Sequence, residues 1–147
     1  MKSASITIRT AIAISGLTLA LNAVAAPSTS SAGLPAPQNA GEVTYITGGA
    51  GKSEADAIRH VARYYPLEVE FLLKAQPKSG QLSDIKVRIK DANDKTILNV
   101  TADGPLLLAK MPAGKYTISA ERNRKVEHRQ FSIAANDHQR VVFEWDA

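Results

Sequence analysis

The chain of 147 residues contains no cysteine. Disulfide bonds, metal sites built from thiolates and membrane anchoring through an acylated cysteine are therefore excluded. Without cross-links, the folded state has to be held together by a hydrophobic core. The sequence is long enough to form such a core in one small domain.

A strong net charge is also lacking. Eighteen basic residues stand against fourteen acidic ones, so that the formal net charge is +4. Lys2 and Arg9 lie near the amino terminus, and without them sixteen basic residues against fourteen acidic ones leave +2. Charges of both signs are intermixed along the chain, as on a surface that keeps a protein soluble. This composition argues against nucleic acid as a partner.

Long apolar runs are missing after residue 25, where no segment approaches the roughly 20 apolar residues that span a bilayer. Residues 1–25 themselves have the pattern of a secretory signal peptide, with basic residues, the short apolar segment Ala11–Ala23 and the cleavage motif Ala23-Val24-Ala25. An uncleaved membrane anchor is the alternative, but the run is short and interrupted by polar residues. We expect an exported chain, periplasmic or extracellular, that starts at Ala26 and does not insert stably into a membrane.

Residues 26–41 are rich in proline, serine, alanine and glycine and contain a single leucine. Such a segment buries too little apolar surface to offset the entropy lost on ordering. It is predicted to be a flexible linker.

Residues 42–65 predict a short extended segment, a glycine-rich loop and one helix. Apolar residues recur at helical spacing over Ser53–Tyr65, and Ser53 followed by Asp56 is typical of a capping box. Pro66 ends the helix, because a residue that precedes proline avoids the helical conformation.

From Pro66 onward the hydrophobic period changes from 3.6 to two. Leu67, Val69 and Phe71 alternate with polar residues, as in a strand that is buried on one face. Turn motifs separate seven such segments at the spacing of a β-sandwich or barrel. The predicted strands are Leu67–Lys74, Ile85–Lys90, Thr96–Val100, Leu106–Lys110, Lys115–Glu121, Lys125–Ile133 and Gln139–Trp145. Residues 66–147 are thus predicted to form one β-sandwich domain.

The turn Met111-Pro112-Ala113-Gly114 launches the fifth predicted strand. Pro112 presets the turn, Gly114 is expected to take a positive φ, and Tyr116 is the first residue of the strand to enter the core. This motif resembles the signature of the carboxypeptidase regulatory-like domains and their transthyretin-like and collagen-adhesin B-type relatives. The resemblance covers roughly residues 66–145. It implies an all-β fold, a seven-stranded antiparallel prealbumin-like sandwich without catalytic residues, preceded here by the linker and the helix.

The glycine-rich loop and the helix lie outside that resemblance, and we take them as the candidate binding surface. Gly-Lys-Ser at the start of a helix invites a phosphate-binding interpretation, but the first glycine of a Walker motif is replaced by Ile46. We therefore predict no nucleotide cofactor. The residues of the candidate surface are Gly48, Gly49, Gly51, His60, Tyr64 and Tyr65.

No catalytic or metal-binding constellation is predicted. His60, His128 and His138 have no second ligand at metal spacing, and they are interpreted as exposed polar residues. Glu68 and Glu70 alternate with core residues, which indicates a solvated strand face. The chain is therefore predicted not to be an enzyme and to need no cofactor.

Lys86, Arg88 and Lys90 make a basic strip on one strand, and four further cations lie near a later hairpin: Arg122, Arg124, Lys125 and Arg129. The strip could face anionic glycans, or it could protect a sheet edge from aggregation, which we favour.

The function predicted from the sequence is an exported, non-enzymatic module with a structural or binding role in the periplasm or cell envelope. Its partner is an unidentified envelope protein or glycan. Binding of an envelope polysaccharide is the first alternative, and a protein-interaction or inhibitor module is the second. Flat sugar platforms use exposed aromatic rings, for which the pattern leaves mainly Tyr45, Tyr64, Tyr65 and Phe131.

Overall fold

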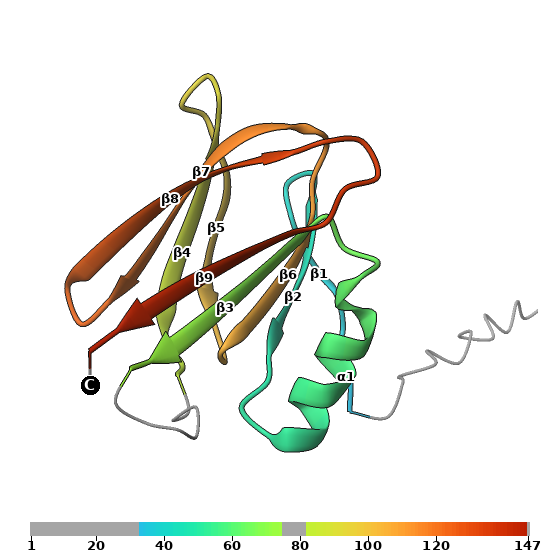
Figure 1. Ribbon diagram of the computed structural model, residues 1–147, viewed down its shortest axis with the longest axis vertical. Helices are drawn as coiled ribbons and strands as arrows, with labels where there is room; N and C mark the ends of the chain where they lie inside the picture. The colour runs from blue at the N-terminus through green and yellow to red at the C-terminus, as the bar shows by residue number, and fades with distance from the viewer. Residues whose placement is uncertain (1–32, 75–81, 147) are drawn as a thin grey trace, which may run out of the picture.

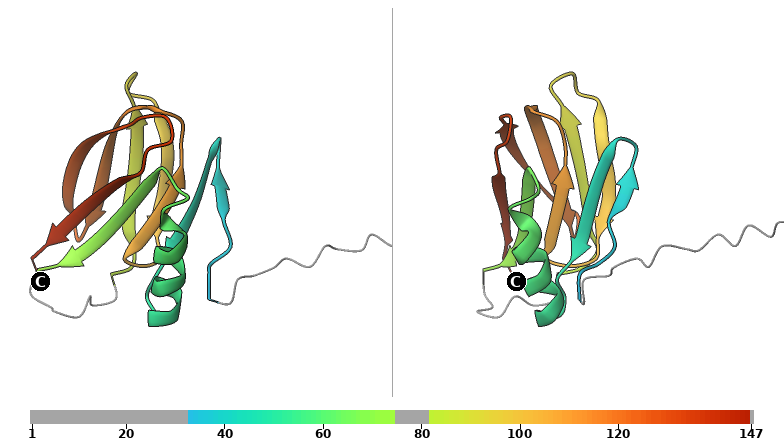
Figure 2. Two further views of the ribbon diagram at one scale, coloured as in Figure 1. Left: turned by 45° about the vertical axis from the view of Figure 1, so that its right-hand side comes forward. Right: turned by 90° about the vertical axis from the view of Figure 1, so that its right-hand side faces the viewer.

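The computed structural model describes residues 33–74 and 82–146. Two β-sheets face one another, and one helix lies on the outer side of one of them (Figures 1 and 2). The elements are β1 (Gln38–Ala40), β2 (Val43–Gly48), α1 (Lys52–Ala62), β3 (Leu67–Leu73), β4 (Ile85–Asp91), β5 (Thr96–Ala102), β6 (Leu106–Lys110), β7 (Gly114–Arg122), β8 (Lys125–Ile133) and β9 (Gln139–Trp145). No helix in these ranges is long and apolar enough to cross a membrane.

The predicted all-β sandwich is confirmed. Five strands form one sheet in the order β1-β2-β6-β3-β9, and four form the other in the order β5-β4-β7-β8. The described residues contain nine strands rather than seven, because two more strands precede the helix. All seven segments that were predicted as strands are strands.

Two features of the sheets correct the prediction. Pairing is not antiparallel throughout, since β3 and β9 run parallel, with Val69 opposite Val141 and Phe71 opposite Phe143. Residues 38–40, within the predicted linker, form β1 and pair with β2. In both cases the pairing of the strands is decided by tertiary packing, which the local composition of a segment does not indicate.

The segment that we placed before the sandwich is part of it. β2 pairs with β6, which lies about 60 residues further along the chain, and directs Val43 and Tyr45 into the core between the sheets. That core also contains Phe71, Phe143 and Trp145, whose rings lie about 6 Å apart. The single tryptophan is buried there as the alternation of the last strand predicts.

A second apolar layer lies beneath the helix. Ile58 and Tyr65 pack against Ile46, Leu106 and Leu108 on the outer face of β2 and β6. Leu107, between the two leucines of β6, faces the main core instead. β6 is buried on both faces, which explains why its sequence is continuously apolar rather than alternating.

The helix begins one residue earlier and ends three residues earlier than predicted. The expected capping box does not form, because the N-cap is Gly51 and no side chain caps it. Instead the Glu54 carboxylate accepts a hydrogen bond from the Gly49 N–H at 2.6 Å. The glycine loop is thereby tied to the first turn of the helix.

The turn before β7 is closed by Tyr116, whose hydroxyl donates to the Pro112 carbonyl at 2.6 Å. Gly114 is the first residue of β7 and does not have the positive φ that we expected. A Cβ at this position would lie 3.4 to 3.5 Å from the end of the Tyr116 ring. These are ordinary contact distances, so the Tyr116 ring, which folds back over its own turn, does not require a glycine at this position.

Candidate functional site

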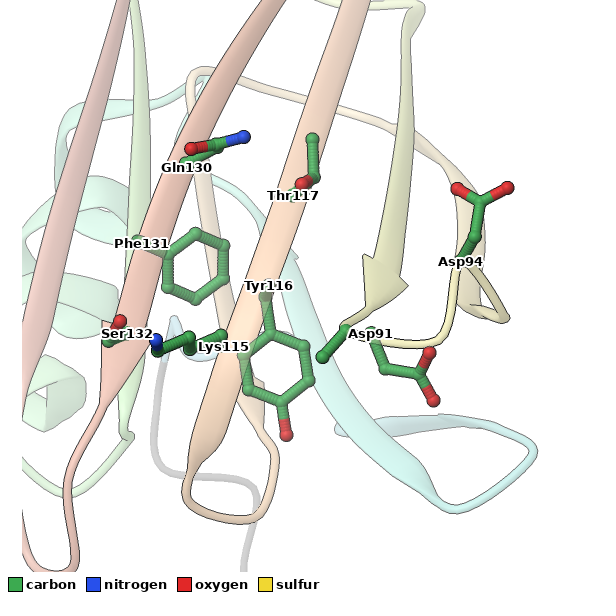
Figure 3. Close-up of a pocket in the computed structure, with 9 residues that line it drawn as sticks. Asp91, Asp94, Lys115, Tyr116, Thr117, Gln130, Phe131 and Ser132 are labelled. Atoms are coloured by element: carbon green, nitrogen blue, oxygen red, sulfur yellow. The ribbon is translucent and has the colours of Figure 1, made fainter.

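A pocket of about 440 Å³ opens at the end of the sandwich where the β4–β5 hairpin meets the start of β7 and the end of β8 (Figure 3). We call it the end pocket. Its described lining residues are Asp91, Ala92, Asp94, Lys115, Tyr116, Thr117, Gln130, Phe131 and Ser132. A neighbouring hollow of about 380 Å³ shares Asp91 and Tyr116 with it and reaches the β1–β2 turn.

Two aromatic rings form the apolar wall of the end pocket. Tyr116 and Phe131 are paired across β7 and β8, and their ring centroids lie 5.5 Å apart in a stacked arrangement. Burial, and secondarily the negative charge of Asp91, raises the pKa of the Tyr116 phenol. The phenol therefore stays protonated and keeps its hydrogen bond to Pro112, which makes it a structural group rather than a base.

The carboxylates of the pocket are held by the hairpin. Asp91 Oδ1 accepts hydrogen bonds from the backbone N–H groups of Asn93 and Lys95, at 2.9 and 3.0 Å. Asp94 Oδ1 lies 3.0 Å from the Lys90 ammonium. This anchoring fixes the polar rim of the pocket against β4.

A shallow groove continues from the end pocket along the outer face of β7. This β7 groove has a volume of about 230 Å³ and is lined by Arg88, Lys90, Asp94, Thr117, Ser119 and His128. Thr117 and Asp94 also line the end pocket. The two hollows therefore adjoin through shared residues.

Sheet register accounts for the groove. Arg88, Ser119 and His128 are directly opposite one another on β4, β7 and β8, and so are Lys90, Thr117 and Gln130. The middle strand carries short hydroxyl side chains while both neighbours carry long ones. Strands lie about 4.8 Å apart, so the walls stand roughly 10 Å from one another across this floor.

The basic strip lies in the interior of a sheet. β4 stands between β5 and β7, so Lys86, Arg88 and Lys90 protect no sheet edge, and the interpretation that we favoured for them is wrong. Arg129 does not extend the strip. It lies opposite the inward-facing Ile118, contacts Glu127 and stacks over the Phe143 ring at 5.3 Å.

The predicted candidate surface is not one site. Gly48 and Gly49 are buried at the amino end of α1, where Gly49 is bonded to Glu54, and Gly51 is the exposed N-cap. The loop is occupied by the protein's own carboxylate, so it offers no cradle for an anion.

The other three members lie on α1 and the turn that follows it. His60 is exposed and Tyr64 is 63% exposed, with the Arg63 guanidinium 4.9 Å from its ring. Tyr65 is buried under the helix, and burial raises the pKa of its phenol. Tyr45 is buried and Phe131 half-buried, so Tyr64 is the single large exposed aromatic among the described residues.

Glu68 and Glu70 do not lie on a solvated face, which corrects the prediction. Their side chains are 13% and 10% exposed because α1 covers the outer face of the sheet beside them. Glu70 pairs with Arg140 and lies 3.6 Å from Arg59 on the helix. Glu68 lies 3.8 Å from Arg140 and 3.1 Å from the His138 ring. The cluster ties α1, β3 and β9 together.

The chemistry of the end pocket is that of a binding site for a polar ligand. In the described part of the chain no three histidine or carboxylate side chains are grouped as metal ligands. Sequence reasoning missed Asp91, Thr117, Ser119 and Gln130 because each belongs to an ordinary alternating strand or turn. Only the register of the three strands β4, β7 and β8 brings them together, and no local pattern reports that register.

No family model and no curated protein sequence matches this chain. Among solved structures, the Bacillus anthracis TIE protein is 16% identical with a TM-score of 0.41, over 55% of this chain and 16% of that chain. Transthyretin from Sparus aurata is 16% identical with a TM-score of 0.36, over 56% of this chain and 87% of that chain. The chain thus spans about a sixth of the length of the TIE protein chain. These likenesses assign neither a family nor a function, and the carboxypeptidase regulatory-like resemblance stays a prediction.

Proposed function

We propose that this chain is an exported, non-enzymatic β-sandwich module that binds a ligand of the periplasm or cell envelope through the end pocket and the β7 groove. The observation that carries the proposal is the pair of adjoining hollows, which share Thr117 and Asp94 and have a polar lining. The signal-peptide pattern of residues 1–25 supports export.

A binding role agrees with the state of the groups around the pocket. Tyr116 is held protonated and hydrogen-bonded, and Asp91 is committed to backbone N–H groups of its own hairpin. A general base needs a free acceptor within reach of a substrate proton; the protonated Tyr116 offers none, and Asp91 Oδ1 already accepts two backbone hydrogen bonds. Rigid polar groups suit recognition instead.

A glycan is the ligand class that the groove favours. Its floor of Thr117 and Ser119, and Gln130 in the adjoining end pocket, offer hydroxyl and amide groups to sugar hydroxyls. Recognition would use hydrogen bonds in a trough rather than stacking on a flat aromatic platform, since the exposed Tyr64 lines neither the end pocket nor the groove.

A protein partner is the second candidate, and it has an observation of its own. The exposed Tyr64 and Arg63 border a hollow of about 350 Å³ together with Pro66, Met111 and Ala135. Exposed tyrosine and arginine are the residues that most often anchor protein interfaces.

Capture from an envelope extract, combined with a glycan array, tests the proposal. We expect the mature chain to retain a ligand, and Ser119→Met in the groove floor to abolish retention while Tyr64→Ser leaves it intact. Retention that depends on Tyr64 and not on Ser119 would favour the protein partner. Hydrolysis of an envelope polymer that is lost on mutation of a single carboxylate or histidine would overturn the non-enzymatic role.

Export is tested separately by fractionation and mass spectrometry. We expect the protein outside the cytoplasm with Ala26 as its first residue. A full-length chain that stays with the membrane fraction would contradict cleavage.

A further inference from the structure

We infer that the β7 groove binds an acidic polysaccharide, with the cations of β4 facing its anionic groups and the hydroxyls of β7 facing its sugar hydroxyls. The inference rests on the proposed function and names the class of ligand for the same site. It follows from the charges along the groove, from the side chains of its floor and from what its lining lacks.

The charges lie along one wall of the groove. Alternate residues of a strand are about 6.6 to 6.8 Å apart, so Lys86, Arg88 and Lys90 form a row of cations on the outer face of β4. Lys86 lies 3.9 Å from Glu121 and Lys90 lies 3.0 Å from Asp94. Within the described ranges Arg88 has no carboxylate partner, so the centre of the row carries an uncompensated positive charge.

Protection of a sheet edge from aggregation does not explain this row of cations, because β4 is an interior strand. Nor do ion pairs within the sheet, since Arg88 is opposite Asn99 on one side and Ser119 on the other. Both of these partners are neutral hydrogen-bonding side chains. A cation in this setting is available to an external anion.

The floor and the far wall of the groove supply neutral polar groups. Ser119 Oγ makes only a long 3.5 Å contact with the Arg88 carbonyl, so its hydroxyl is free to bond a ligand. His128 is exposed on the opposite wall, and Gln130, two residues further along β8, is exposed in the adjoining end pocket. A row of cations beside hydroxyl and amide groups matches a ligand that carries both anionic groups and hydroxyls.

The lining also lacks the features that other partners need. None of its residues is a large apolar side chain, and Val126 is the one large exposed hydrophobe on the described part of this sheet. A bilayer interface or a peptide would be expected to use buried apolar or aromatic anchors. β7 runs from Gly114 to Arg122 and extends beyond the two groove-floor residues Thr117 and Ser119 at both ends, so an extended chain can continue along the strand. A hydrated chain of sugars is therefore the occupant that fits.

The test measures retention and affinity of the mature chain with three acidic polysaccharides: polygalacturonate, alginate and hyaluronate. Dextran is the neutral comparison, and vesicles of phosphatidylglycerol and phosphatidylcholine present anionic lipid. We expect binding to at least one acidic polysaccharide, none to dextran or vesicles, and a loss of binding when ionic strength rises from about 0.05 to about 0.5 M.

Variants locate the site. Arg88→Gln with Lys90→Gln should weaken binding about tenfold, the sum of two exposed charge contacts. Lys52→Gln with Lys74→Gln removes the same charge from exposed positions on α1 and at the end of β3, and should leave affinity unchanged. Ser119→Met fills the floor without altering charge, and should abolish binding.

Several results would overturn the inference. One is failure to bind all three acidic polysaccharides, and another is preference for anionic vesicles. Equal weakening by the two double variants, or no effect of Ser119→Met, would mean diffuse attraction rather than docking. Equal binding of dextran through Ser119 would overturn the acidic ligand while leaving the proposed function standing. If no capture from the envelope extract depended on the groove either, both the acidic ligand and the proposed function would be overturned.

Discussion

Glycines show how differently one residue type is used in this chain. Gly49 has a φ of 91°, and a Cβ there would lie 3.1 Å from the Leu106 side chain. Gly114 has no positive φ, and a Cβ there would make ordinary contacts with the Tyr116 ring. The turn that identifies the fifth strand therefore depends less on its glycine than the loop before the helix does.

Alanine substitution separates the two glycines. Gly49→Ala should lower the free energy of unfolding by about 1 to 3 kcal/mol, because a side chain is strained at that φ and crowds Leu106. Gly114→Ala should change it by less than about 0.5 kcal/mol. Urea unfolding followed by circular dichroism measures both, and an equal loss in the two variants would contradict this account.

Because of Tyr116, the stability of the protein should depend on pH in the alkaline range. Its pKa is raised in the folded protein by burial and then by Asp91, above the value of about 10 in an unfolded chain. The stabilising contribution of the protonated Tyr116 phenol is therefore fully present below its pKa in the unfolded chain and is lost as pH rises through its pKa in the folded protein. The free energy of unfolding should begin to fall as pH approaches about 10 and should keep falling until pH exceeds the folded pKa of Tyr116.

Tyr116→Phe isolates this effect, because it keeps the stack on Phe131 but removes the titrating hydroxyl. It should cost about 1 kcal/mol at neutral pH, since the Pro112 carbonyl loses its donor, and should decline less steeply above pH 9. The variant is compared with the wild-type protein. Tyr65, whose pKa is also raised, is present in both proteins, so the difference between their alkaline slopes reports on Tyr116. Identical alkaline slopes in the two proteins would exclude Tyr116 as the cause.

At the scale of elements, the helix is held by ion pairs as well as by its apolar face. Arg140 reaches both Glu68 and Glu70, and Arg59 on α1 approaches the same Glu70. The two carboxylates are mostly covered, so their charges depend on these partners. The cluster is a structural attachment between α1 and the two neighbouring strands.

Arg140→Met should therefore lower the free energy of unfolding by about 1 to 3 kcal/mol, because it leaves buried carboxylates short of a partner. Hydrogen exchange should speed up first along the β3–β9 pairing, which Arg140 bridges. Lys52→Gln is the matched control, since its ion pair with Asp56 is fully exposed and its loss should have no measurable effect. A larger effect of the control than of Arg140→Met would refute the attachment.

At the scale of the whole molecule, the sandwich includes the segment before Pro66. β2 covers one edge of β6, and α1 covers Leu106 and Leu108 on its outer face. A sheet without them would expose both a strand edge and an apolar surface. Such exposed edges and surfaces promote aggregation.

A chain that starts at residue 66 should therefore be insoluble or only partly folded, whereas one that starts at residue 33 should fold cooperatively. Size-exclusion chromatography and thermal unfolding distinguish them. A monomeric, cooperatively unfolding chain from residue 66 would show that the domain boundary predicted from sequence was adequate.

Sequence patterns predicted a helix or strand correctly wherever the cause of that element is local. Alternation, together with the turn motifs that bound the apolar run of β6, located all seven strands after Pro66, and helical periodicity located α1 to within three residues, because side-chain direction follows directly from backbone period. The long apolar run of β6 was recognised as a strand, but its burial on both faces was not, since the helix that covers it comes from elsewhere in the chain.

What the sequence by itself determined is the β-sandwich, the burial of Phe71, Tyr116, Phe143 and Trp145, and the absence of disulfide cross-links. The tertiary structure alone decided that β2 joins β6, that β3 and β9 run parallel, and that Glu68 and Glu70 are covered. It also decided that Arg88, Ser119 and His128 share one row. Local periodicity specifies which way a side chain points, whereas strand order and register depend on packing between residues that are distant in sequence.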